Sequence, residues 1–144
     1  RFGRVVAEPR RRGVGELLNV TRSRFAVKRL TALARPGRRP LPDSMLDEIA
    51  ASWDAGMSRA VLGLYRSADP DVLAAAGSRL DDLECPALVL WATGDPYIGV
   101  EQGRWYEAAL PSARLEPVDD AGHWLWLDRP DVVDKVVAHL APLG

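Results

Sequence analysis

The 144-residue sequence has little cysteine, no long apolar run and no cluster of metal ligands. A single cysteine, Cys85, excludes an internal disulfide framework. No apolar stretch approaches the ~18 residues needed to cross a bilayer, so no membrane association is expected. No Cys/His cluster has the spacing of a zinc site. No secretory signal is visible, and a cytoplasmic location is the expectation.

The net charge of −1 hides an uneven distribution of charge along the chain. Residues 1–39 carry twelve Arg and Lys against Glu8 and Glu16, so their balance is +10, and residues 40–144 sum to −11. A basic stretch of this kind could contact nucleic acid, with an affinity that falls steeply as salt rises. Phe2 and Phe25 are its only aromatic residues, too few for a base-stacking surface. A solvated arginine-rich face is therefore favoured, and no nucleic-acid partner is expected.

The first eighty residues show helical apolar spacing and no alternating strand pattern. The series from Val14 to Leu33 predicts one helix, or two joined near residues 22–24. Residues 36–42 hold three prolines and a glycine, which predict a loop. Further helices are expected from an N-cap at Asp43 or Ser44 to a stop at Gly56, over residues 58–66, and from Pro70. Residues 1–80 are therefore interpreted as one mostly helical region.

A different pattern begins at Asp81. Residues 86–92 form a continuous apolar run, which is typical of a strand buried on both faces of a parallel sheet. A helix over 101–110 follows, then an alternating strand over 114–118, whose Pro117 favours a sheet edge. Residues 130–140 predict a last helix. The order strand, helix, strand, helix over 81–144 predicts an α/β fold with a right-handed, parallel βαβα unit.

Each predicted strand is followed by a sharp turn that carries one titratable residue. Asp95 follows the first strand beside Gly94, and His123 follows the second beside Gly122. The carboxyl ends of parallel strands meet at one edge of the sheet, where catalytic groups gather. A carboxylate there could accept the Nδ1 proton of the imidazole and stabilise the imidazolium. Alone, either residue is better explained as a turn former or a packed histidine; together they point to catalysis.

Residues 83–95, which read Leu-Glu-Cys-Pro-Ala-Leu-Val-Leu-Trp-Ala-Thr-Gly-Asp, resemble the seventh strand and catalytic-acid turn of the α/β-hydrolase family. Residues 114–124, ending Asp-Ala-Gly-His-Trp, resemble its eighth strand and histidine loop, and residues 128–140 resemble its last helix. This specific similarity covers 81–144, whereas residues 1–80 resemble, more loosely, the family's helical cap. The family order is nucleophile, acid, histidine. The resemblance therefore implies that Asp95 is the acid and His123 the histidine.

The family's nucleophile elbow, Gly-x-Ser-x-Gly or its aspartate equivalent, has no counterpart here, because no serine has glycines at the required offsets. The resemblance implies the carboxy-terminal part of a cofactor-independent hydrolase, with the nucleophile and the oxyanion-hole loop outside these 144 residues. It implies a small apolar substrate (an ester, epoxide, haloalkane or C–C bond) and a covalent intermediate, with His123 as general base. The alternative is a non-catalytic binding protein or an inactive fragment.

Aromatic residues supply the candidates for substrate binding. Trp124 could lie at the rim of the site and Trp126 beneath the last helix, but core packing is the favoured interpretation for both. The resemblance implies that Trp53 and Tyr65, on cap helices, line the substrate pocket; Tyr65 could also donate its phenol to an epoxide oxygen. Cys85, at the start of a strand, is expected in the core.

Overall fold

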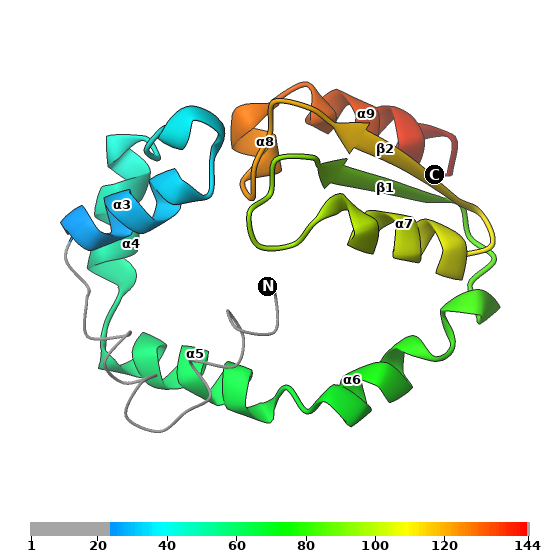
Figure 1. Ribbon diagram of the computed structural model, residues 1–144, viewed down its shortest axis with the longest axis horizontal. Coiled ribbons are helices and arrows are strands. Elements are labelled where there is room, and N and C mark those ends of the chain that lie inside the picture. The colour runs from blue at the N-terminus through cyan, green and yellow to red at the C-terminus, as the bar shows by residue number, and fades with distance from the viewer. Residues whose placement is uncertain (1–23, 144) are drawn as a thin grey trace. The chain divides into compact units, whose positions relative to one another are not determined.

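The computed structural model describes residues 24–143 (Figure 1). Most of the helical pattern predicted before Phe25 lies outside the described residues. The described chain divides into two compact units. The first holds residues 24–33 and 39–76; the second holds residues 34–38 and 77–143.

The first unit consists of helices in the part of the chain that the structure describes. They are α3 (Arg24–Leu33), α4 (Asp43–Ser52), α5 (Ala55–Ser67) and α6, which runs over Pro70–Gly77. Helices α3 and α4 pack together, and Arg24 binds Asp43 at 3.0 Å and Asp47 at 2.6 Å. Leu46 of α4 is completely buried.

Two helix boundaries differ from the predicted ones. Pro42, and not Asp43 or Ser44, is the N-cap of α4, and no side chain caps that end. Asp54 caps α5 by accepting a hydrogen bond from the amide of Met57 at 2.7 Å. This cap starts α5 at Ala55, so Gly56 lies in its first turn and the predicted helix stop there is wrong.

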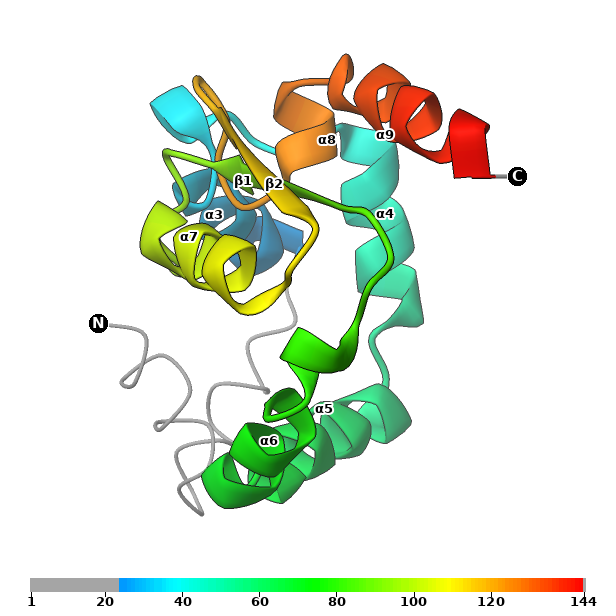
Figure 2. The same cartoon turned by 90° about the vertical axis from the view of Figure 1, so that its right-hand side faces the viewer.

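The second unit is built on two parallel strands, β1 (Ala87–Ala92) and β2 (Ala113–Val118), in which Ala92 pairs with Val118. Helix α7 (Val100–Ala109) connects them, and α9 (Val132–Leu140) follows β2. Figures 1 and 2 show these two helices on opposite faces of the sheet. The predicted α/β class and its βαβα order are confirmed.

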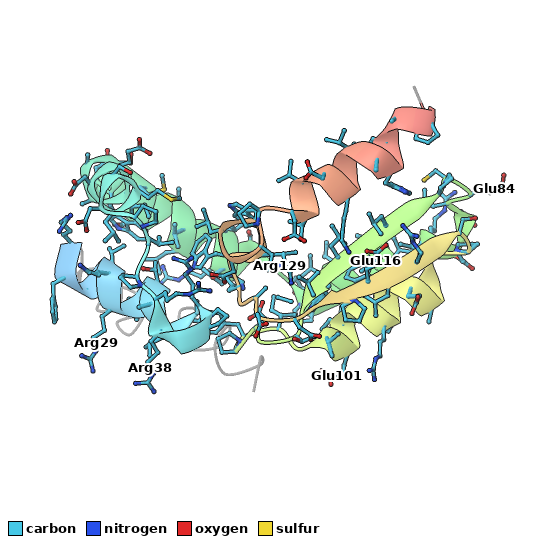
Figure 3. The ribbon with its side chains drawn as sticks, turned by 90° about the horizontal axis from the view of Figure 1, so that it is seen from above. Arg29, Arg38, Glu84, Glu101, Glu116 and Arg129 are labelled. Atoms are coloured by element: carbon cyan, nitrogen blue, oxygen red, sulfur yellow. The ribbon has the colours of Figure 1, made fainter. Side chains whose placement is uncertain are left out.

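Short elements complete the second unit. A single helical turn, α8 (Leu125–Asp128), was not predicted, and 3-10 turns lie at Pro36–Arg38, Leu80–Asp82 and Ala141–Leu143. Lys135 of α9 binds Glu116 of β2 at 2.6 Å, and Figure 3 shows Glu116 between strand and helix. None of the helices within residues 24–143 is long and apolar enough to cross a membrane.

The core of the second unit lies at the carboxyl ends of the strands. Ala92 and Val118, the last residues of β1 and β2, pack with Ala121 and Val132. These four side chains are buried, and Leu90 and Leu125 pack against them. The two loops that leave the strands therefore start from a fixed base.

Three expectations about burial are wrong. Cys85 is exposed, because it precedes β1 and does not enter the sheet. Residues 87–91 of β1 are only half-buried, since β2 is the strand's one partner in the described chain. Trp126 is 54% exposed instead of packing under the last helix. Its segment forms the helical turn α8, where residues two apart point in different directions, instead of an alternating strand.

Candidate catalytic site

The turns after β1 and β2 are joined by backbone hydrogen bonds. The amide of Thr93 donates to the carbonyl of Val118 at 3.0 Å, and the amide of Gly94 donates to the carbonyl of Ala121 at 3.1 Å. A side chain at Gly94 would place its Cβ 2.8 Å from the Ala121 oxygen, so this close approach requires glycine. The residues that follow Gly94 and Ala121 are therefore brought side by side.

The predicted pair meets at this point. Nδ1 of His123 lies 2.9 Å from Oδ2 of Asp95. The Asp95 side chain is 10% exposed and that of His123 is 36% exposed. An ionised carboxylate only accepts hydrogen bonds, so with Asp95 ionised and the imidazole neutral this contact places the proton on Nδ1 and leaves Nε2 as an acceptor. This is the arrangement in which an imidazole can take up a proton at Nε2 while a carboxylate stabilises the resulting cation.

The second oxygen of Asp95 is held by the backbone of its own turn. Oδ1 accepts hydrogen bonds from the amides of Tyr97 at 2.8 Å and Ile98 at 3.2 Å. These two donors fix the plane of the carboxylate, and Oδ2 is thereby directed at the imidazole. One residue thus both closes the turn and orients His123.

Aromatic rings flank the imidazole. The ring of Tyr97 lies 5.1 Å from that of His123 at 88°, and the ring of Trp124 lies 5.6 Å away at 78°. Burial, and then the negative charge of Asp95, raise the pKa of Tyr97 above its ordinary value. Nε1 of Trp124 is buried and has no hydrogen-bond partner among the described residues. Trp124 therefore lies beside His123, and its role in substrate binding stays a prediction. Tyr97 was not predicted, although it is only two positions from Asp95.

The backbone of the histidine loop is held by a segment distant in sequence. The amide of His123 donates to the carbonyl of Ala34 at 2.8 Å. The amide of Gly122 donates to Oδ2 of Asp128 at 3.0 Å, and Nε of Arg35 donates to Oδ1 of the same carboxylate at 2.8 Å. Residues 34–38 were interpreted from the sequence only as the approach to a loop and the loop itself. No local pattern marks Ala34 or Arg35 as part of a site.

The other candidate residues lie in the first unit. Nε1 of Trp53 donates to Oγ of Ser58 at 3.1 Å. A hollow of ≈ 330 Å³ is lined by Glu48, Ile49, Ser52, Trp53 and Met57. Tyr65 is half-buried on α5. The roles of Trp53 and Tyr65 in substrate binding stay predictions. Within residues 24–143, no group of three or more His, Cys, Asp or Glu could hold a metal ion.

Comparison with known sequences gives consistent matches. Residues 1–136 match the sequence model of the Alpha/beta hydrolase family. The chain is 30% identical over 102 residues to the pimeloyl-[acyl-carrier protein] methyl ester esterase of Aromatoleum aromaticum, covering 71% of this chain and 39% of that protein. It is 25% identical over 71 residues to 2-hydroxy-6-oxononadienedioate/2-hydroxy-6-oxononatrienedioate hydrolase 2 of Pseudomonas putida, covering 49% of this chain and 25% of that protein. The chain thus spans well under half the length of these curated relatives.

Two solved structures have a similar fold. A serine hydrolase involved in carbazole degradation, the CarC enzyme, superposes with a TM-score of 0.66 at 13% identity, over 83% of this chain and 48% of that one. Est816, described as an N-acyl homoserine lactone degrading enzyme, gives 0.50 at 22% identity, over 68% and 39% of the two chains. At these identities the likeness is one of fold.

Proposed function

Because this chain belongs to the alpha/beta hydrolase family, we propose that it supplies the acid and the histidine of a nucleophile–histidine–acid triad, with Asp95 as the acid and His123 as the histidine. The observation that carries the proposal is the 2.9 Å contact between Nδ1 of His123 and the Asp95 carboxylate. The nucleophile is part of the proposal, and it lies outside these 144 residues.

In the proposed reaction with a serine nucleophile, Nε2 of His123 takes the hydroxyl proton as the serine oxygen attacks the substrate. The imidazolium that forms is stabilised by Asp95, whose carboxylate stays ionised. His123 then gives its proton to the leaving group, and a covalent intermediate remains. Water, activated by the same imidazole, hydrolyses this intermediate and restores the free nucleophile. No cofactor takes part in these steps.

The proposed substrate is a small, fairly apolar molecule. Tyr97 and Trp124 give the site apolar surface beside His123. Among ester, C–C, epoxide and haloalkane bonds, the names of the curated relatives favour the first two. We further propose that the helical region acts as a cap whose Trp53 and Tyr65 line the substrate pocket, and that the protein is cytoplasmic. The alternative is a non-catalytic binding protein or an inactive fragment.

The first test is to read the encoding DNA upstream of the codon for Arg1. An open frame with a Gly-x-Ser-x-Gly or equivalent aspartate elbow supports the enzyme. A start codon at this point, with no elbow before it, supports the non-catalytic alternative.

The second test measures hydrolysis of a chromogenic short-chain ester by the protein expressed from that whole frame. His123→Ala or Asp95→Asn is expected to lower kcat on the order of 10³- to 10⁴-fold, because each removes a member of the triad. His139→Ala is the matched control, since His139 is the chain's other histidine and lies in the last turn of α9. Near-full rates in both site variants would remove the proposed roles.

A further inference from the structure

We propose that Arg35 and Asp128 are positioning residues, which hold the backbone on either side of the Gly122–His123 peptide so that the imidazole meets Asp95. This inference rests on the proposed function of His123 as a base. It concerns a geometry that can be measured without any activity, however, so the two proposals can fail separately.

The Asp128 carboxylate is an unusual group for a solvent-facing turn, because it is completely buried. Its side chain is 0% exposed and that of Arg35 is 9% exposed. A buried carboxylate is strongly unfavourable unless it is paired and hydrogen-bonded. Asp128 meets this requirement through the guanidinium of Arg35 and the amide of Gly122, so its charge is used to hold the histidine loop.

Two consecutive residues thereby hold two consecutive amides. Ala34 accepts directly from the amide of His123, and Arg35 acts through Asp128 on the amide of Gly122. Arg35 also lies 3.4 Å from the carbonyl of Leu127, a second contact with the same turn. The backbone of the loop is therefore held on one side by residues 34–35, while the imidazole is held by Asp95.

A neighbouring ion pair is more exposed and does not contact the Gly122–His123 peptide. Arg129 binds Asp131 at 2.8 Å, with side chains 39% and 48% exposed. Arg129 also donates to the carbonyl of Asp119, and none of these bonds involves the amide of Gly122 or that of His123. Arg129 and Asp131 are also an arginine–aspartate pair, and they follow Asp128 by one and three positions. They therefore provide a matched control for the buried pair.

Positioning makes a specific prediction about the Nδ1 proton of His123. While the backbone is held, this proton stays in its hydrogen bond to Asp95 and exchanges slowly with water. Asp128→Asn keeps the size of the side chain, but its one carbonyl oxygen cannot replace both carboxylate acceptors. The imidazole is then expected to leave Asp95 more often, and the Nδ1 proton to exchange about 10- to 100-fold faster, the factor for losing one charge-assisted hydrogen bond.

The experiment is nuclear magnetic resonance of the full chain labelled with ¹⁵N-histidine, in which His139 serves as an internal reference in every spectrum. Faster exchange of the His123 Nδ1 proton in Asp128→Asn, with wild-type exchange in Asp131→Asn, is the expected result. A lower melting temperature with unchanged Nδ1 exchange would overturn the proposal, because Asp128 would then have a structural role alone. Equal effects of Asp128→Asn and Asp131→Asn would overturn it too.

If Asp128→Asn does not fold, the double variant Arg35→Met with Asp128→Leu takes its place. Replacing both buried partners by apolar side chains is often tolerated in stability, yet it removes the acceptor of the Gly122 amide. Fast exchange of the His123 Nδ1 proton in this folded variant supports positioning, and wild-type exchange overturns it. In an active preparation the same variants are expected to lower kcat and leave KM unchanged. Absence of all hydrolysis would defeat the proposed function and leave the exchange result standing.

Discussion

Gly122→Ala is expected to push the histidine loop away from the segment that holds it. The added Cβ would lie 3.0 Å from Cα of Arg35 and 3.1 Å from the carbonyl carbon of Ala34, and closer still to the Ala34 oxygen. These are backbone atoms, which cannot rotate aside as the end of a long side chain can. The loop must move, and the hydrogen bond from the His123 amide to Ala34 lengthens or breaks.

Two costs set the size of the effect. Forcing one extra methyl group into a closely packed site costs about 1–3 kcal/mol. Losing one backbone hydrogen bond adds about 1 kcal/mol. The free energy of unfolding is therefore expected to fall by about 2–4 kcal/mol, which lowers the melting temperature of a chain of this length by roughly 6–15 °C.

The assay combines thermal unfolding with hydrogen exchange of the His123 amide. Gly63→Ala is the matched control, because Gly63 is inside α5 and its added Cβ would meet no described atom within 4 Å apart from its chain neighbours and its own helix backbone. Alanine is the better helix former, so this control is expected to stabilise by about 0.5–1 kcal/mol. If Gly122→Ala keeps the wild-type melting temperature and slow hydrogen exchange at the His123 amide, the close approach of residues 34 and 122 is refuted.

Three further outcomes are expected. Ser58 is only 7% exposed, and Ser58→Ala removes the acceptor of the Trp53 indole N–H. The free energy of unfolding in urea should fall by about 1–2 kcal/mol, and no change would contradict the contact. The raised pKa of Tyr97 means that the folded chain holds this phenolic proton more tightly than the unfolded chain. Its stabilising contribution is therefore present below the ordinary pKa of 10.0 and is lost as the pH rises through the folded value. Absorbance titration of the phenols should also show that Asp95→Asn lowers the Tyr97 pKa only in part, since burial is the larger cause. Cys85 should react with one equivalent of a thiol reagent in the native chain, and protection until unfolding would contradict its exposure.

The sequence was sufficient for the parts of the site that depend on local patterns. The apolar run before Gly94 and the alternation before Asp119 define β1 and β2 to within one residue. Once two consecutive strands are parallel, their carboxyl ends meet at one edge. Asp95 lies three positions after the end of β1 and His123 five positions after the end of β2, so the strand positions predict that the two turns are neighbours.

The support of the histidine loop could not be predicted in this way. Ala34 and Arg35 lie next to a proline-rich stretch that has no strand or helix period, and their partners are about ninety residues away. Asp128 has the appearance of an ordinary turn residue before a helix. Only the three-dimensional structure shows that its carboxylate is buried and faces Arg35.

The errors elsewhere have local causes. The stretch from Trp124 to Leu127 alternates in a way that suits a strand, but it forms a helical turn, so Trp126 faces solvent. Gly56 was interpreted as a helix stop because the sequence does not reveal that Asp54 caps the next helix. The assignment of residues 1–80 as a cap and 81–144 as the core stays a prediction.

The contacts around His123 also imply an order of assembly during folding. Asp95 is 28 residues from His123, whereas Arg35 is 93 residues from Asp128. Closing the longer loop costs about 1 kcal/mol more in chain entropy. We therefore expect the imidazole to find its carboxylate early, when the two strands pair, and the segment at residues 34–35 to join late. A newly folded chain would then pass through a state in which the histidine has its partner but its loop is not yet fixed.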